Sequence, residues 1–198
     1  PWDLCIAMCE VFIRNGGEVR ISSEVTQTES SDDGWILHLP NGRVRARYVV
    51  NTAGLYSDEV HAQVSPPDFR ILPARGQYFL LDKREGERVH RVLFSCPSED
   101  TKGVLITRTA HGNLIVGPTK ESVPDKEDTA TTAEGLAEIR KKALRMVDSI
   151  RFRDNIANFS GIRANTDRDD FIIRAVPGVN HYVEAAGIKS PGLASAPA

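Results

Sequence analysis

The sequence lacks several features that would assign it at once to a familiar class. It has no uninterrupted apolar stretch of the ~18 residues that a membrane-spanning helix needs, and no charged-then-apolar segment typical of a secretory signal. It has only three cysteines, an odd number that argues against a disulfide framework and makes a reducing cytoplasm the expected location. Its formal net charge of −2 indicates neither nucleic acid nor an anionic membrane as a partner.

Two further kinds of chemistry also lack their signatures. The sequence contains no Gly-x-Ser-x-Gly motif, so it does not support a hydrolase, and no residue stands out as a general base. Cys5 and Cys9 have a spacing compatible with metal binding, but no second pair or nearby histidine completes four ligands. We therefore expect no metal site and expect both cysteines to be buried. The histidines show no ligand spacing, and we expect His111, in a hairpin turn, to be exposed.

Apolar periodicity and turn residues predict a mixed chain of class α/β, or α+β. We expect a first helix with Leu4, Met8, Val11 and Phe12 on one face and Asp3 as its cap, and further helices at residues 57–64 and 132–148. The expected strands are residues 18–22, 25–29, 35–39, 44–51, 71–82, 91–95, 103–107, 113–117, 155–164, 171–176 and 181–186.

These elements suggest three parts. Residues 1–65 would be the remnant of an incomplete FAD/NAD(P)-binding-type domain, and residues 68–178 a substrate-binding domain with a mainly antiparallel sheet and a flanking helix. Residues 179–198 would be a return strand and the start of a helix. Because that helix begins about one turn before the last residue, and the first residue is not Met, we expect the chain to be a piece of a larger protein. We also expect exposed sheet edges to favour pairing with a second copy.

The C-terminal segment is the most informative part of the sequence. A strand runs into Gly187, and Ser190 should then cap a helix that has Pro191 at its first position. Such a helix start presents backbone N–H groups and the positive end of the helix dipole. We expect it to face an anionic group of a cofactor or substrate.

Several short motifs occur together in a recognisable order: VVNTAGLYSD at residues 49–58, LPARGQY at 72–78, GVLI at 103–106 with HGNLIVGPT at 111–119, FSGIRA at 159–164 with DDF at 169–171, and AGIKSPGL at 186–193. In this order they resemble the D-amino-acid-oxidase superfamily of FAD-dependent oxidoreductases. Within it they are most similar to glycerol-3-phosphate dehydrogenases, and next to L-2-hydroxyglutarate oxidases.

The resemblance implies FAD as cofactor and hydride transfer to the flavin from glycerol 3-phosphate or a small anionic 2-hydroxy acid. It implies that Arg163 grips the phosphate or carboxylate of the substrate with its planar fork of donors, and that Lys189 and Tyr78 also contact the substrate. The implied cofactor contacts are Val25, Asn51, Thr52, Ala53, Gly54, Gly187, Ile188, Lys189, Ser190, Pro191 and Gly192.

Each of these assignments has a plainer alternative. Arg163 could pair with Asp169 or Asp170 at the surface, Lys189 could be solvated, and Tyr78 could be a packing aromatic. The glycines could simply be turn residues. Two other functions also stay open: an amine-oxidising relative such as an amino-acid oxidase, with Arg163 on the substrate carboxylate, and a noncatalytic binding module.

One departure from the superfamily pattern is large. The Gly-x-Gly-x-x-Gly turn that holds the pyrophosphate does not occur in these residues, and Gly16 and Gly17 are adjacent and end a helix, which is the wrong context. We therefore expect this chain by itself to bind FAD poorly or not at all and to be inactive. In the intact protein we expect a small anionic substrate and a membrane-associated electron acceptor as partners.

Overall fold

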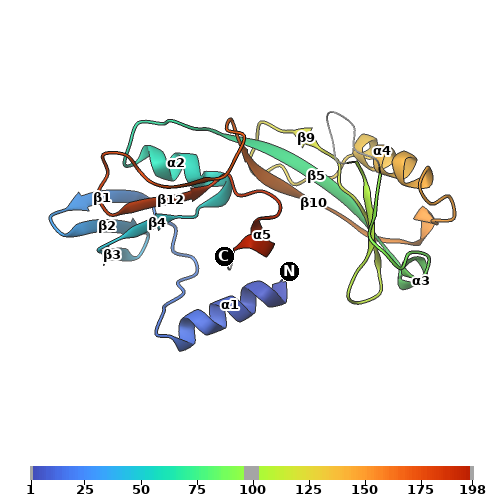
Figure 1. Ribbon diagram of the computed structural model, residues 1–198, viewed down its shortest axis with the longest axis horizontal. Helices are drawn as coiled ribbons and strands as arrows, with labels where there is room; N and C mark the ends of the chain where they lie inside the picture. The colour runs from blue at the N-terminus through green and yellow to red at the C-terminus, as the bar shows by residue number, and fades with distance from the viewer. Residues whose placement is uncertain (1, 96–102, 197–198) are drawn as a thin grey trace. The chain divides into compact units, whose positions relative to one another are not determined.

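The computed structural model describes residues 2–95 and 103–196 (Figure 1). The chain divides into two compact units, residues Pro1–Ile71 with Asp167–Ala198 (unit 1) and residues Leu72–Thr166 (unit 2). The predicted mixed α/β class is confirmed, because helices accompany sheets that are largely antiparallel. Among the described residues, no helix combines the length and apolar character needed to cross a membrane.

Unit 1 contains two three-stranded sheets. The first is an antiparallel meander of β1 (Gln27–Ser31), β2 (Gly34–Leu39) and β3 (Gly42–Ala46). The second has the order β11-β12-β4, and its core includes Trp35 packed edge-on to Tyr182, with ring centroids 5.5 Å apart. The remaining elements of unit 1 are α1 (Trp2–Arg14), β4 (Val49–Asn51), η1 (Gly54–Tyr56), α2 (Ser57–Ala62), β11 (Ile172–Ala175), β12 (Tyr182–Ala186) and α5 (Gly192–Ser195).

The second sheet joins segments that are far apart in the sequence. β12 pairs with β11 in antiparallel fashion but with β4 in parallel, and Glu184 lies opposite Asn51 in the register. Figure 1 shows α2 lying along this parallel pair. Since parallel strands point the same way, the turns that follow β4 and β12 leave from the same edge of the sheet.

Unit 2 is built on a sheet of order β10-β5-β8-β7-β6, with β9 added to β5. One core is formed by the apolar faces of its strands and of α4, including Leu81, Ile106 and Ile139. Thr132 caps α4 by accepting a hydrogen bond from the Gly135 N–H at 3.1 Å. The elements are β5 (Ile71–Leu81), α3 (Lys83–Gly86), β6 (Leu93–Phe94), β7 (Leu105–Arg108), β8 (Leu114–Gly117), β9 (Glu121–Ser122), α4 (Ala133–Leu144), η2 (Phe152–Asp154) and β10 (Asn155–Thr166).

Several local predictions are wrong. Residues 18–22 are irregular rather than a strand, and Val19 and Ile21 are exposed, because no described strand lies beside them to complete a hydrogen-bond ladder. The single strand expected at residues 44–51 is two strands, since the chain leaves one sheet after β3 and enters the other at β4. Asp3 lies inside the first turn of α1 instead of capping it.

The cysteines also differ from the prediction. Cys5 and Cys9 are exposed, because α1 has no buried residue; Cys96 lies outside the described residues. The part of the chain that the structure describes holds no group of three or more side chains suited to a metal ion. His111 is exposed, as predicted. Of the C-terminal segment singled out in the sequence, Pro197 and Ala198 also lie outside the described residues.

Candidate functional site

The parallel pair of β4 and β12 brings together two of the segments expected to hold the cofactor. Asn51 ends β4 and residues 52–54 follow it, while residues 187–192 follow β12, so both turns start at the carboxyl edge of neighbouring parallel strands. In open α/β sheets, this edge is where ligands bind. The geometry of unit 1 therefore provides a candidate dinucleotide site at this edge.

The first turn is organised by Asn51, whose side chain is buried. Its Oδ1 accepts a hydrogen bond from the Ala53 N–H at 3.1 Å, and its Nδ2 donates to the Ser57 carbonyl at 2.9 Å. Gly54 has a φ of +57°, which glycine adopts readily, and a Cβ built there would meet nothing within 4 Å. The main chain of this turn is therefore held in place and is open to a ligand on the Gly54 side.

In the second turn, the helix starts at a different residue from the one predicted. α5 begins at Gly192, Pro191 occupies the cap position, and no side chain caps the helix, so Ser190 is not the cap and Pro191 is not the first helical residue. The reason is a tight turn before the helix, in which the Lys189 N–H donates to the Gly187 carbonyl at 3.0 Å and the Gly192 N–H to the Lys189 carbonyl at 2.7 Å. Two of the N–H groups expected to face a ligand are thus used within the turn.

Val25 does not belong to either of these turns. It belongs to the irregular segment that precedes β1, where it is partly exposed. None of the hydrogen bonds described for unit 1 joins Val25 to residues 51–54 or 187–192. Its place at the cofactor stays a prediction.

In unit 2, the structure brings two of the predicted substrate residues together. Arg163 on β10 points its Nη2 at the Tyr78 hydroxyl on the neighbouring strand β5, at 3.5 Å, and its Nη1 at the Thr119 carbonyl, at 3.4 Å. Tyr78 is stacked on Phe159, with the ring planes 9° apart. Both contacts of Arg163 are longer than an ordinary hydrogen bond, so the guanidinium retains donor capacity for an anion. Lys189, the third predicted substrate residue, belongs to unit 1.

Gly76 explains why the Arg163 side chain can lie against β5. A Cβ built on Gly76 would be 2.5 Å from Nη2 and 2.6 Å from Nη1 of Arg163, closer than side chains pack. The guanidinium therefore occupies the space that any other residue at position 76 would fill. The sequence offered Gly76 only as part of the LPARGQY motif.

Sequence reasoning missed a buried cluster of titratable side chains in unit 1. The side chains of His61 and Glu184 are 1% and 0% exposed, and His61 Nδ1 lies 2.5 Å from Glu184 Oε1. Arg174 contacts Glu184 at 3.4 Å and Asp68 at 2.6 Å. His61 and Glu184 are 123 residues apart in the sequence, so no local spacing pattern predicts their contact.

The environment shifts the pKa of three groups around this cluster. Desolvation raises the pKa of Asp68, but the hydrogen bond and charge of Arg174, with help from His61 and Arg168, outweigh it and lower the pKa overall. The hydrogen bond to Asp68 is the largest cause that raises the pKa of Arg174. Burial, and then the charge of Glu184, raise the pKa of Tyr182 to about 12.

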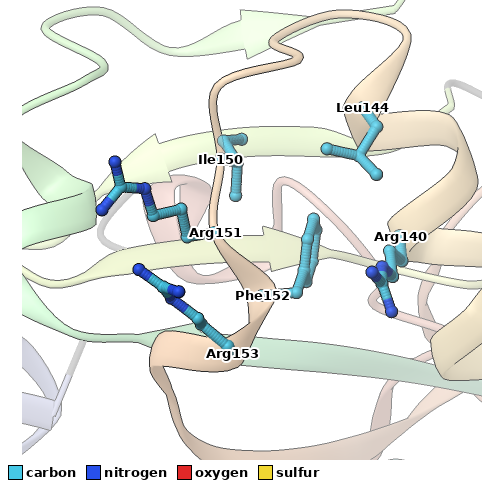
Figure 2. A pocket seen from close by; sticks show the side chains of 6 residues that line it. All are labelled: Arg140, Leu144, Ile150, Arg151, Phe152 and Arg153. Atoms are coloured by element: carbon cyan, nitrogen blue, oxygen red, sulfur yellow. The ribbon is translucent and has the colours of Figure 1, made fainter.

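A separate surface hollow of 390 Å³ lies in unit 2 (Figure 2). Figure 2 shows Arg151 and Arg153 extending to one side, with Phe152 beside Arg140. Arg163 lies eight residues along β10 from Asn155, a span of roughly 25 Å in a strand, so this hollow is remote from the predicted substrate residues of the same unit. The lining residues are Arg140, Leu144, Ile150, Arg151, Phe152 and Arg153.

Comparison with known proteins gives a consistent result. A family model described as FAD dependent oxidoreductase (DAO) matches residues 1–198. The glycerol 3-phosphate dehydrogenase of Caloramator mitchellensis is 45% identical over 198 residues, which are 100% of this chain and 41% of that protein. The structure of dithionite-reduced L-α-glycerophosphate oxidase from Mycoplasma pneumoniae, with FAD bound, matches with a TM-score of 0.84 at 30% identity, over 93% of this chain and 50% of the other.

A glycine oxidase from Geobacillus kaustophilus matches with a TM-score of 0.68 at 21% identity, over 90% of this chain and 46% of the other, which shows a shared fold alone. The chain thus spans about half or less of the length of these proteins.

Proposed function

The chain belongs to the DAO family of FAD-dependent oxidoreductases, and from this premise we propose that it is part of an enzyme that oxidises glycerol 3-phosphate. The main support for the proposal is the position of Arg163. Its guanidinium lies against Gly76, and its contacts with protein atoms are long enough to leave N–H donors for a substrate anion. Two relatives support the choice of substrate: the 45% identical protein from C. mitchellensis is a glycerol 3-phosphate dehydrogenase, and the M. pneumoniae structure is a glycerophosphate oxidase.

The candidate dinucleotide site fits the cofactor that the family implies. FAD, when bound, accepts the hydride that leaves the alcohol carbon of the substrate. We assign residues 51–54 and 187–192 to the site, because both turns lie at one carboxyl edge and their glycines Gly54 and Gly187, with φ of +57° and +65°, allow close approach of main chain to ligand. Lys189, in the second turn, would balance negative charge on the flavin or on the substrate.

Arg163 and Tyr78 are the residues that we propose to bind the phosphate of the substrate. A phosphate group accepts parallel hydrogen bonds from the two Nη atoms of a guanidinium, and this pairing is strong when water is scarce. The Tyr78 hydroxyl, 3.5 Å from Nη2, would give the same anion a further donor. The plane of Tyr78 is set by its stack on Phe159, so the hydroxyl is held toward Arg163 rather than free to turn away.

The test of the reaction is flavin reduction. The protein, expressed from its complete gene, is mixed anaerobically with glycerol 3-phosphate, L-2-hydroxyglutarate or amino acids, and the visible absorbance of the flavin is followed. We expect bleaching by glycerol 3-phosphate. Bleaching by an amino acid and not by either hydroxy compound would show that the protein is an amine oxidase.

The test of the site is Arg163→Met. Loss of a desolvated anion clamp should raise the apparent substrate constant by an amount equivalent to ~2–4 kcal/mol. Arg153→Met is the matched control, since Arg153 is 75% exposed and lines the remote hollow. Equal substrate constants for the two variants would exclude the clamp role of Arg163.

A further inference from the structure

The buried pair of His61 and Glu184 lies next to the candidate dinucleotide site. Glu184 is on β12, opposite Asn51 of β4 in the parallel register, and His61 reaches it from α2. The Glu184 Oε1 receives His61 Nδ1 at 2.5 Å and the Asn51 amide nitrogen at 3.5 Å. A buried carboxylate is costly unless it is paired and hydrogen-bonded, and here its partners come from three different elements.

The surroundings of the imidazole leave it one orientation. Nδ1 faces the Glu184 carboxylate, and Nε2 faces the Pro66 carbonyl at 3.2 Å and Asp68 Oδ1 at 3.5 Å. All of these neighbours are acceptors when the carboxylates are ionised, so a ring turned over or a ring without donors would lose its contacts with Glu184 and with the Pro66 carbonyl. The ring also packs edge-on against Phe69, with centroids 5.3 Å apart. His61 therefore holds Glu184 at a defined position.

That position matters for the turn that follows β4. The Asn51 amide nitrogen donates to the Ser57 carbonyl at 2.9 Å and makes a longer, weaker contact with Glu184 at 3.5 Å. With the nitrogen on that side, Oδ1 is directed at the Ala53 N–H. The hydrogen bond to Ala53 fixes the backbone of residues 51–53 just before Gly54. A chain of contacts thus runs from the imidazole through a carboxylate and an amide to the main chain of the candidate site.

We propose that His61 is a positioning residue for the dinucleotide site, acting through Glu184 and Asn51 on the backbone of residues 51–54. This inference rests on the proposed function for the identity of the ligand. The role differs from plain packing. Buried polar partners can often be replaced by apolar side chains of similar size without loss of stability, whereas an apolar pair offers no acceptor to the Asn51 amide nitrogen.

The experiment compares three variants. His61→Phe keeps a ring but has no donor, His61→Asn keeps an N–H₂ group near the place of Nδ1, and His61→Phe combined with Glu184→Met replaces the pair by apolar groups. Each is measured for unfolding by urea, for hydrogen exchange of the Ala53 amide by NMR, and for FAD affinity in the protein expressed from its complete gene. The backbone N–H of Asn113, which donates to Thr109 Oγ1 at 3.0 Å in unit 2, is the internal control for exchange.

We expect the double variant to be about as stable as the wild type, yet to lose protection at Ala53 and to bind FAD about tenfold more weakly, the change expected from one buried hydrogen bond. His61→Phe should lose the same protection, and His61→Asn should keep it, with Asn113 unchanged throughout. A stable double variant with normal Ala53 exchange, or with the FAD affinity of the wild type, overturns the proposal. A double variant that fails to fold also overturns the proposal, because His61 and Glu184 would then be required for the stability of the fold.

The two proposals can fail separately. If the wild-type protein takes up no FAD, the proposed function is wrong, but the exchange of Ala53 still decides whether His61 positions the turn. If the wild type binds FAD and the stable double variant binds it equally well, the positioning role alone is wrong.

Discussion

Gly76 offers the sharpest test of how this fold prepares a substrate clamp, and the variant to make is Gly76→Ala. The added Cβ would be 2.5 Å from Arg163 Nη2, whereas ordinary van der Waals contact starts at 3.4 Å, so the guanidinium must retreat by about 1 Å. The atoms that clash are the far end of a flexible side chain, and Gly76 does not have a positive φ. The variant should therefore fold with a change in unfolding free energy below about 1 kcal/mol.

The displacement should appear in substrate binding instead. Each hydrogen bond between a charged donor and the substrate anion contributes about 1.5–3 kcal/mol, and a guanidinium shifted by about 1 Å loses at least one of the pair. We expect KM for glycerol 3-phosphate to rise by about ten- to a hundredfold, with a smaller effect on kcat. Steady-state kinetics with the flavin-loaded protein measures the split, and thermal unfolding measures stability.

The chain supplies a matched control and a stricter check. Gly161→Ala places the same methyl group on β10, but a Cβ there meets nothing within 4 Å, so KM should not change. In an Arg163→Met background, Gly76→Ala should have no further effect, because its target has been removed. The reasoning is refuted if Gly76→Ala leaves KM unchanged, or if it raises KM equally with and without Arg163.

Three further predictions concern Tyr182 and Asp68. The Tyr182 hydroxyl is buried without a hydrogen-bond partner in the described chain, so Tyr182→Phe should raise the free energy of unfolding by up to about 1 kcal/mol in urea titrations, and an unchanged or lower value would indicate a partner. Because the pKa of Tyr182 is raised to about 12, one of the four tyrosines should resist ionisation in an ultraviolet pH titration until the pH approaches that value, and this late step should vanish in the variant. The pKa of Asp68 is lowered below its ordinary value of 3.8, so its contribution to stability is present above that pH and is lost as the pH falls through the lowered value. Asp68→Asn should therefore flatten the acid limb of the stability profile below about pH 4, whereas an identical acid limb in wild type and variant would show that the pair with Arg174 contributes nothing.

Family and local structure were within reach of the sequence. The motifs at residues 49–58 and 186–193 each combine a strand with the turn that follows it, whereas residues 72–78 lie within strand β5. The order of these motifs along the sequence identified the DAO family. The helix α4 was predictable because Thr132 is a good cap and its apolar residues repeat at helical spacing. Its end was predicted four residues too late, since the chain leaves the helix after Leu144 while apolar residues continue.

Contacts between distant residues were decided only by the tertiary structure. Three contacts join residues 87 or more positions apart: Glu184 opposite Asn51 in the parallel register, His61 with Glu184, and Arg163 over Gly76. No local spacing pattern predicts contacts between residues so far apart in the sequence. The exposure of Cys5 and Cys9 was equally out of reach, because an apolar periodicity shows that a helix has an apolar face but not whether anything covers it. Local sequence patterns record the preferences of neighbouring residues along the chain, whereas the site depends on which strands pair and in what register.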